Sequence, residues 1–68
     1  MTEQELENCR GHKVRLTDKN GNVYEALAKF FESSYDNEPN EACITLEMPY
    51  GLVEFNISEI QDVERISK

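Results

Sequence analysis

The residues of this chain best suited to chemistry are two cysteines and a single histidine. Cys9 and His12 have a C-x-x-H spacing, and Cys43 supplies a second thiol farther along. Thiolate and imidazole groups are the usual ligands of zinc, but a structural zinc site needs four ligands, most often as two close pairs. The sequence offers three, so we expect no metal and no cofactor. A zinc-stabilised domain built on these three residues is the weaker alternative.

No set of residues has the pattern of a catalytic site. Cys9 and His12 have the chemistry of a nucleophile and its base, but their short segment supplies no third group to orient the imidazole. Acidic residues are abundant, yet no pair is set apart as an acid and a base; Glu47 and Glu54 are expected to face each other across two strands. A 68-residue chain also has little room for an enclosed substrate pocket. We therefore expect that the protein is not an enzyme.

The charge of the chain bears on its class of partner. The chain has 14 acidic and seven basic residues, which gives a net charge of -7. Such a charge favours solubility and repels phosphate backbones. Nucleic-acid binders usually carry a basic patch or stripe, whereas here Lys13, Arg15, Lys19 and Lys29 are interrupted by acids. The composition favours a protein partner and disfavours RNA.

The N-terminal segment and the cysteines predict the compartment. Residues 1–13 have no apolar core, so they match neither a signal peptide nor a membrane anchor. No run approaches the roughly 20 apolar residues of a membrane span. Two cysteines without a secretory signal favour free thiols in a reducing environment. We expect a cytoplasmic protein without membrane contact.

The elements that position these residues begin with one long hairpin. Val14 and Leu16 alternate with polar residues, which is the period of a half-buried strand. Asn20-Gly21 follows as a hairpin signal, because both residue types tolerate positive φ. The run 23–32 then carries apolar residues on both faces and small residues in its middle, which favours a strongly bent strand of a small barrel. A helix over 23–33 is the alternative, because several of these residues are good helix formers.

The rest of the chain predicts one short helix and three more strands. Thr2 and Glu5 have the spacing of a capping box, which predicts a helix over residues 2–8, with a disordered acidic tail as the alternative. The further strands are expected at 42–48, 52–57 and 62–66, with a helical turn at 58–61. Five short strands without a long helix predict an all-β barrel or sandwich. We expect one domain over 1–68, with the helix or tail in 1–12 and the barrel in 13–66.

This order of elements resembles the Sm-like (LSm) family, and the matching pieces run from Val14 to Ile66. That resemblance implies a small, five-stranded, strongly bent antiparallel SH3-like barrel with a short N-terminal helix. The second motif of the family would cover 52–57, 58–60 and 62–66. The first motif is matched by Val14, Leu16, Asn20-Gly21, Tyr24, Ala28 and Phe31-Glu32, with Ala26 in place of the family's glycine.

The family also implies a function, which this sequence supports poorly. Sm-like proteins bind RNA as rings that close by pairing the fourth strand of one subunit with the fifth strand of the next. The two loops that hold bases in the family correspond to 35–41, which is acidic, and 56–59, which lacks the family's Arg-Gly and Tyr-Lys-His motifs. Acids at these positions oppose phosphate binding. The ring edges would involve Val53, Phe55, Val63 and Arg65.

The sequence therefore favours a non-catalytic interaction module. It would form a homo-oligomer or bind a protein partner through strand edges and an acidic surface. The alternative is an RNA-binding ring whose basic residues, Lys13, Arg15, Lys29 and Arg65, gather on one face. The polar contact site is expected to use Tyr35, Asp36, Glu38, Tyr50 and Glu59; the alternative is that all five are merely solvated.

Overall fold

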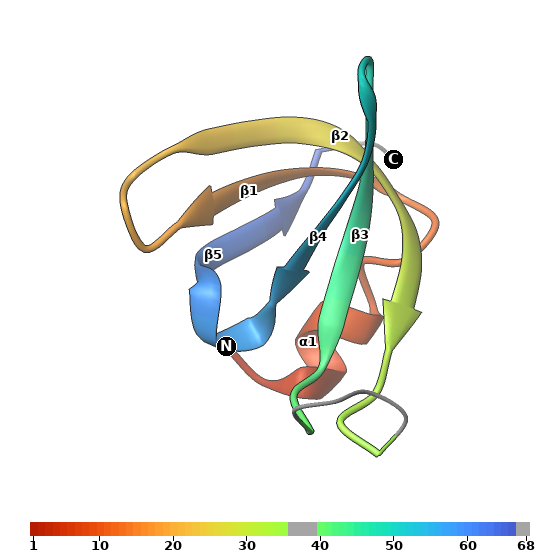
Figure 1. Ribbon diagram of the computed structural model, residues 1–68, viewed down its shortest axis with the longest axis vertical. Helices are drawn as coiled ribbons and strands as arrows, with labels where there is room; N and C mark the ends of the chain where they lie inside the picture. Colours follow the sequence, from red (N-terminus) through yellow and green to blue (C-terminus); the bar gives the residue numbers. More distant parts are fainter. Residues whose placement is uncertain (36–39, 67–68) are drawn as a thin grey trace.

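The computed structural model of the protein describes residues 1–35 and 40–66. Two of the expected contact residues, Asp36 and Glu38, lie outside the described residues. The strands form one antiparallel sheet in the order β4-β3-β2-β1-β5, which curls into a barrel (Figure 1). This confirms the expected all-β fold. The elements are α1 (Glu3–Glu7), β1 (Lys13–Asp18), β2 (Val23–Glu32), β3 (Cys43–Met48), β4 (Gly51–Asn56), the 3-10 helix η1 (Ile57–Glu59) and β5 (Ile60–Arg65).

The predicted hairpin joins β1 to β2, but its turn differs from a two-residue Asn-Gly turn. The amide of Asp18 donates to the carbonyl of Asn22 at 2.9 Å, and the amide of Gly21 donates to the carbonyl of Asp18 at 3.0 Å. This encloses a three-residue loop in which Gly21 has a φ of 86°. Among the described residues other than glycine, only Asn40 has a positive φ, so in this turn Gly21 adopts one and Asn20 does not.

The strand β2 bends where its pairing with β3 is irregular. Ala28 lies opposite Leu46 and Phe30 lies opposite Thr45, so Lys29 is an extra residue in the ladder. One extra residue shifts the inward and outward positions by one. This shift explains the apolar residues on both faces of the sequence pattern: Ala28 points inward before the bulge, and Phe31 packs against the core after it. The predicted bent strand is confirmed, and the alternative helix over 23–33 does not form.

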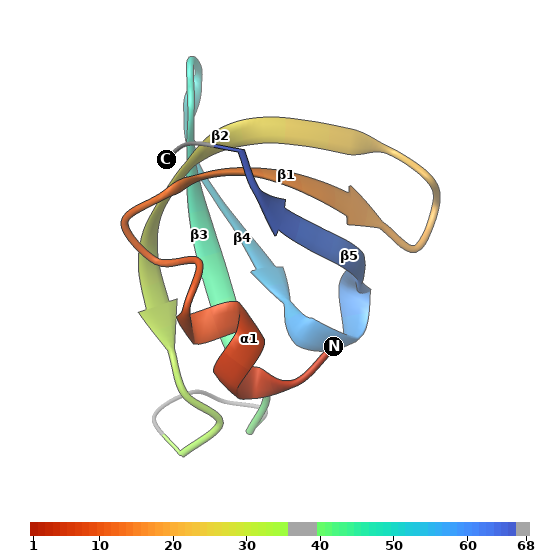
Figure 2. The same cartoon turned by 180° about the vertical axis from the view of Figure 1, so that it is seen from behind.

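The helix α1 closes the barrel at the end where β3 begins (Figure 2). Its predicted capping box is present: the Glu5 amide donates to the Thr2 hydroxyl at 3.1 Å, and the Thr2 amide donates to the Glu5 carboxylate at 2.7 Å. Leu6 and Cys9 are buried among strand residues such as Leu16, Ile44 and Leu46. No helix in the described parts of the chain is long and apolar enough to cross a membrane.

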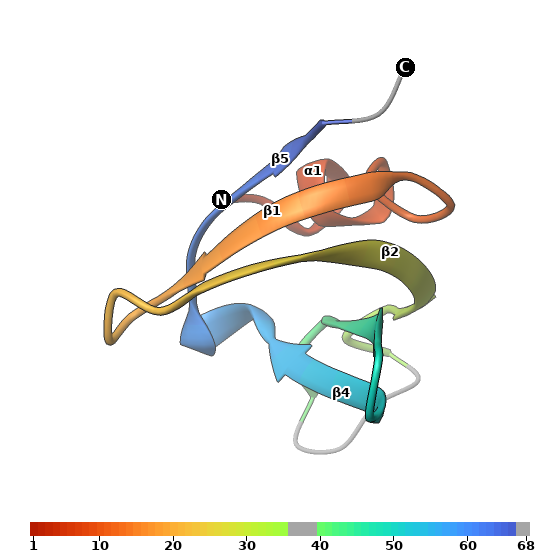
Figure 3. The same cartoon turned by 90° about the horizontal axis from the view of Figure 1, so that it is seen from above.

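The strands β4 and β5 form the two edges of the sheet (Figure 3). Each pairs with one neighbour, β4 with β3 and β5 with β1. The helical turn between them begins and ends earlier than expected, at Ile57–Glu59 rather than 58–61. Ile60 therefore opens β5 as a buried strand residue.

Candidate protein-interaction surface

The outer face of the sheet over β2, β3 and β4 carries a mixture of apolar and acidic side chains. The register places Phe30 and Glu54 on either side of Thr45, and Leu27 and Leu52 on either side of Glu47. A third row runs from Glu32 through Cys43 to Asn56. We call these three rows the acidic-apolar face. Glu47 thus lies opposite Leu52 rather than Glu54, which corrects the expectation that the two glutamates face each other.

The large apolar side chains exposed on this face are Leu27, Phe30 and Leu52. Phe30 is 50% exposed and Leu52 is 53% exposed. Phe30 and Leu52 line a shallow hollow of about 410 Å³ together with Phe31, Glu32, Thr45 and Glu54. Single exposed apolar residues are ordinary, but here Phe30 and Leu52 border one depression.

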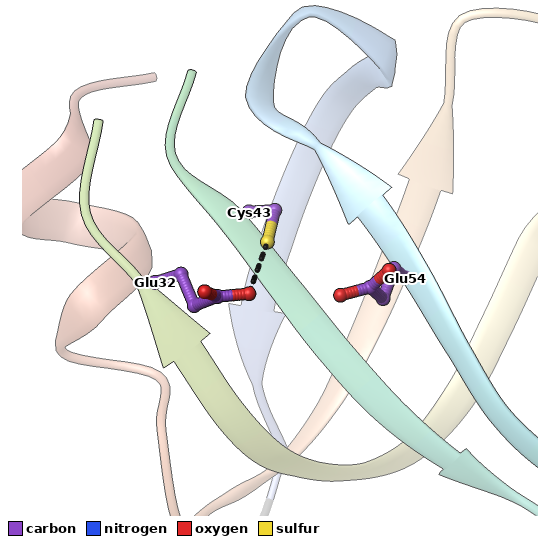
Figure 4. A group of neighbouring side chains, drawn as sticks. All are labelled: Glu32, Cys43 and Glu54. Carbon is purple, nitrogen blue, oxygen red and sulfur yellow. Dashed lines mark hydrogen bonds between the residues drawn. The ribbon is translucent and has the colours of Figure 1, made fainter. Parts of the chain in front are cut away.

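Glu32 and Glu54 converge on Cys43 from the two neighbouring strands (Figure 4). Their carboxylate oxygens and the Cys43 sulfur all lie within 4.8 Å of one another. The thiol donates a hydrogen bond to Glu32 at 3.7 Å. Burial, together with the negative charges of the two glutamates, raises the pKa of Cys43 to about 11. Cys43 is therefore a protonated thiol at neutral pH.

The two carboxylates lack a cationic partner within the described part of the chain. Its ion pairs are Arg15–Glu25 at 2.7 Å, Arg15–Glu64 at 2.8 Å and Lys29–Glu47 at 3.1 Å. Like charges that lie close together on a sheet repel each other. The pair Glu32 and Glu54 thus presents an uncompensated negative charge beside Phe30 and Leu52.

The outer face over β1 and β5 has a different electrostatic character. Arg15 on the central strand of this region lies between Glu25 on β2 and Glu64 on β5, and it pairs with both. The pKa of Arg15 is raised further by its hydrogen bonds to these two glutamates. Both glutamates of this face thus share the guanidinium of Arg15, whereas Glu32 and Glu54 have no ion pair in the described chain, so the acidic-apolar face is the surface better suited to an external cation.

The described residues of the predicted contact site lie on three different connections between strands. Tyr35, which is 94% exposed, follows β2, and Tyr50 lies in the β3–β4 turn. These two connections lie at opposite ends of β3 (Figure 1). Glu59 belongs to η1, where its carboxylate accepts a hydrogen bond from the Asn56 amide at 2.9 Å. A common contact surface for these residues stays a prediction.

The residues predicted for a ring edge lie on β4 and β5, but three of them point inward. Val53 packs against the core, Phe55 and Val63 are buried, and Arg65 is exposed. The ring of Phe55 lies 5.0 Å from that of Tyr24. The edges would therefore offer a partner mainly their backbone groups. Oligomerisation through them stays a prediction.

The structure separates the residues of the zinc alternative. Cys9 lies at the end of α1, where its thiol donates to the Glu5 carbonyl at 3.4 Å. In the described chain, the group of potential ligands that gathers around Cys43 consists of Glu32 and Glu54, without Cys9 or His12. Both cysteines are free thiols. Two carboxylates and one protonated thiol are fewer than the four ligands of a structural zinc site.

Sequence reasoning missed the residues that form the acidic-apolar face. The alternation in 43–48 and 52–57 contained part of the signal, since it placed Thr45 and Glu54 outward. The position of Phe30 beside them depends on the bulge in β2. The pattern of 23–32 predicted a bent strand, but it indicated neither the position of the bulge nor the register of β2 with β3.

Comparison with known proteins adds evidence on the fold. No protein-family model matches the chain, and no curated protein is similar enough in sequence to count as a relative. Among solved structures, YaeO bound to magnesium from Vibrio cholerae O395 is similar, with a TM-score of 0.67 and 24% sequence identity. The match covers 85% of this chain and 71% of that chain. A likeness at this identity shows the fold alone, and membership of the Sm-like family stays a prediction.

Proposed function

We propose that the chain is a non-catalytic interaction module that binds a protein partner through the acidic-apolar face. The observation that carries this proposal is the exposed pair Phe30 and Leu52 beside the uncompensated carboxylates of Glu32 and Glu54. Aromatic and apolar side chains supply the binding energy at the centre of protein interfaces. Charged groups add specificity and speed up association with a partner of opposite sign.

The edge strand β4 extends this surface. The molecule exposes 4487 Å² in total, and a standard interface of about 800 Å² per partner would occupy roughly a fifth of that area. The hollow alone is too small for such an interface. Leu52 and Glu54 belong to β4, whose outer edge has no paired strand in the described chain. The partner would therefore contact the face and the neighbouring edge together.

RNA binding by an Sm-like ring is the alternative, and the placement of charge disfavours it. Of its four proposed basic residues, Arg15 and Lys29 already pair with glutamates of the same chain. Phosphates would have to compete with these carboxylates. Phosphate neutralisation by lysine and arginine supplies most non-specific affinity for nucleic acid, so we place RNA second.

Photo-crosslinking in the protein's own cells tests the proposal. Phe30 would be replaced by p-benzoylphenylalanine, and a matched control would carry the same substitution at Val23, which is equally exposed on the other half of β2. We expect a discrete adduct with another protein from position 30 and none from position 23. Adducts of equal yield from both positions would contradict the proposed surface, and an RNA adduct would favour the alternative.

A further inference from the structure

Resting on the proposed function, we propose that the hollow of the acidic-apolar face receives an arginine side chain from a basic segment of the partner. The guanidinium would lie between Glu32 and Glu54, and its aliphatic stem would lie against Phe30 and Leu52. Such a site differs from a general attraction for positive charge, because it binds one type of side chain at one place on the sheet.

The spacing of the two carboxylates suits a single planar cation. Their oxygens lie within 4.8 Å of each other, and an N–H donor to a carboxylate lies about 2.8 Å from the oxygen. A cation placed slightly to one side of the line between the oxygens therefore reaches both. A guanidinium offers several donors in one plane, so each carboxylate can accept a separate hydrogen bond.

The walls of the hollow suit the uncharged part of the same side chain. Phe30 and Leu52 flank it, and the buried Thr45 lies on the strand between them. An arginine stem can pack against such apolar groups while its charged head stays hydrated at the rim. The ring of Phe30 already has one cation near it, since the ammonium of Lys29 lies 5.7 Å from its centre.

Lys29 does not neutralise the two glutamates itself. Its ammonium pairs with Glu47 at 3.1 Å, one row away from Glu54 on the sheet. The positive charge of Lys29, which lies near the Phe30 ring, is therefore already balanced, and the charges of Glu32 and Glu54 remain for a ligand. A planar guanidinium stacks on an aromatic ring and bridges carboxylates better than a compact ammonium does, which favours arginine over lysine.

Titration with blocked tripeptides tests this inference on the whole chain. The probes are acetyl-Gly-Xaa-Gly-amide with arginine, lysine or norleucine at the centre, followed by the backbone amide signals of the labelled protein. We expect saturable shifts at Phe30, Cys43, Thr45 and Glu54 with the arginine peptide. The lysine peptide should bind more weakly, and the norleucine peptide should leave these signals unchanged. Equal affinity for arginine and lysine would overturn the assignment.

Two double variants with the same loss of charge sharpen the test. Removing both carboxylates with Glu32→Gln and Glu54→Gln should weaken arginine binding about tenfold or more, because two charge-assisted hydrogen bonds are lost. The control, Glu7→Gln with Asp62→Asn, removes two exposed acids elsewhere and should change the affinity less than about twofold. Equal losses in both variants would mean that the peptide responds only to net charge.

Phe30→Ala tests the apolar wall without changing the charge, and it should also lower the affinity for the arginine peptide.

Magnesium or zinc chloride added without the peptide should leave the signals of Glu32 and Glu54 in place. A metal that displaced the bound peptide would overturn the arginine assignment. If the tripeptide fails to bind but the crosslink from position 30 persists, the arginine pocket is wrong and the proposed function stands. If both fail, the proposed function is wrong as well.

Discussion

Cys43 is the residue whose chemistry depends most directly on the acidic-apolar face. It is only 2% exposed, and the two glutamates that flank it add to the effect of burial on its pKa. The position of Cys43 on a strand was predicted from the sequence. Its pairing with Glu32 was not, because the partner across the sheet is fixed by register rather than by the neighbours of Cys43 in the chain.

The raised pKa of Cys43 predicts a loss of stability at alkaline pH. In the unfolded chain a cysteine titrates near pH 8.5, at about its ordinary value, whereas folding raises the pKa of Cys43 to about 11. Between these values the folded state holds the proton that the unfolded state has released, so the free energy of unfolding falls as pH rises. Below this window Cys43 contributes no pH dependence.

Urea unfolding of the wild type and of Cys43→Ser across this window measures the effect. The serine variant keeps every other titrating group, so the difference between the two proteins isolates Cys43. We expect the stability of the wild type to fall more steeply with pH than that of the variant. Parallel curves would show that the pKa of Cys43 does not change on folding.

At the scale of elements, the hairpin and the bulge decide where the face lies. The hairpin could be predicted because the Asn20-Gly21 signal is local. The N-terminal capping box could be predicted for the same reason, since Thr2 and Glu5 satisfy each other within one turn. The bulge at Lys29 could not be predicted, because it depends on how β2 pairs with β3, a strand more than ten residues away in the sequence.

Gly21 provides a test of the hairpin geometry. Its φ of 86° is unfavourable for an L-residue, while a methyl group added there would meet no atom within 4 Å. Gly21→Ala should therefore lower the free energy of unfolding by about 1–2 kcal/mol through backbone conformation alone. A synthetic chain with D-alanine at this position should be at least as stable as the wild type. Equal destabilisation by both forms would instead indicate a steric clash.

The capping box of α1 provides a second test at this scale. Thr2→Ala removes the hydroxyl that accepts a hydrogen bond from the Glu5 amide. Such a loss lowers the free energy of unfolding by about 0.5–2 kcal/mol. Thr2→Ser keeps the acceptor and serves as the control. Thermal unfolding of the two variants measures the difference. If the alanine and serine variants melt together, α1 contributes nothing to stability through its cap.

At the scale of the whole molecule, the small core determines stability and the charged surface is available for binding. Residue type alone would not reveal this division, since leucines occur both in the core and on the surface. Leu46 is fully buried, whereas Leu52 is largely exposed on the neighbouring strand. The core stabilises the barrel, and the exposed leucine is free to contact a partner.

Truncation of these two leucines should separate stability from binding. Leu46→Ala should lower the free energy of unfolding by about 2–5 kcal/mol, because it removes buried methyl groups and leaves a cavity. Leu52→Ala should change stability by less than about 1 kcal/mol and should weaken partner binding. Denaturant unfolding measures both effects. Comparable destabilisation by both variants would mean that Leu52 also belongs to the folding core.

The most direct test of the account is a comparison of the proteins that co-purify with three forms of the chain, expressed at wild-type level in its own cells. These are the wild type, the Glu32→Gln/Glu54→Gln variant and the Glu7→Gln/Asp62→Asn variant, which has the same net charge as the second. We expect that one protein is retained by the wild type and by the Glu7/Asp62 variant but lost from the Glu32/Glu54 variant. Identical sets of co-purifying proteins for all three forms would mean that the acidic-apolar face does not bind the partner.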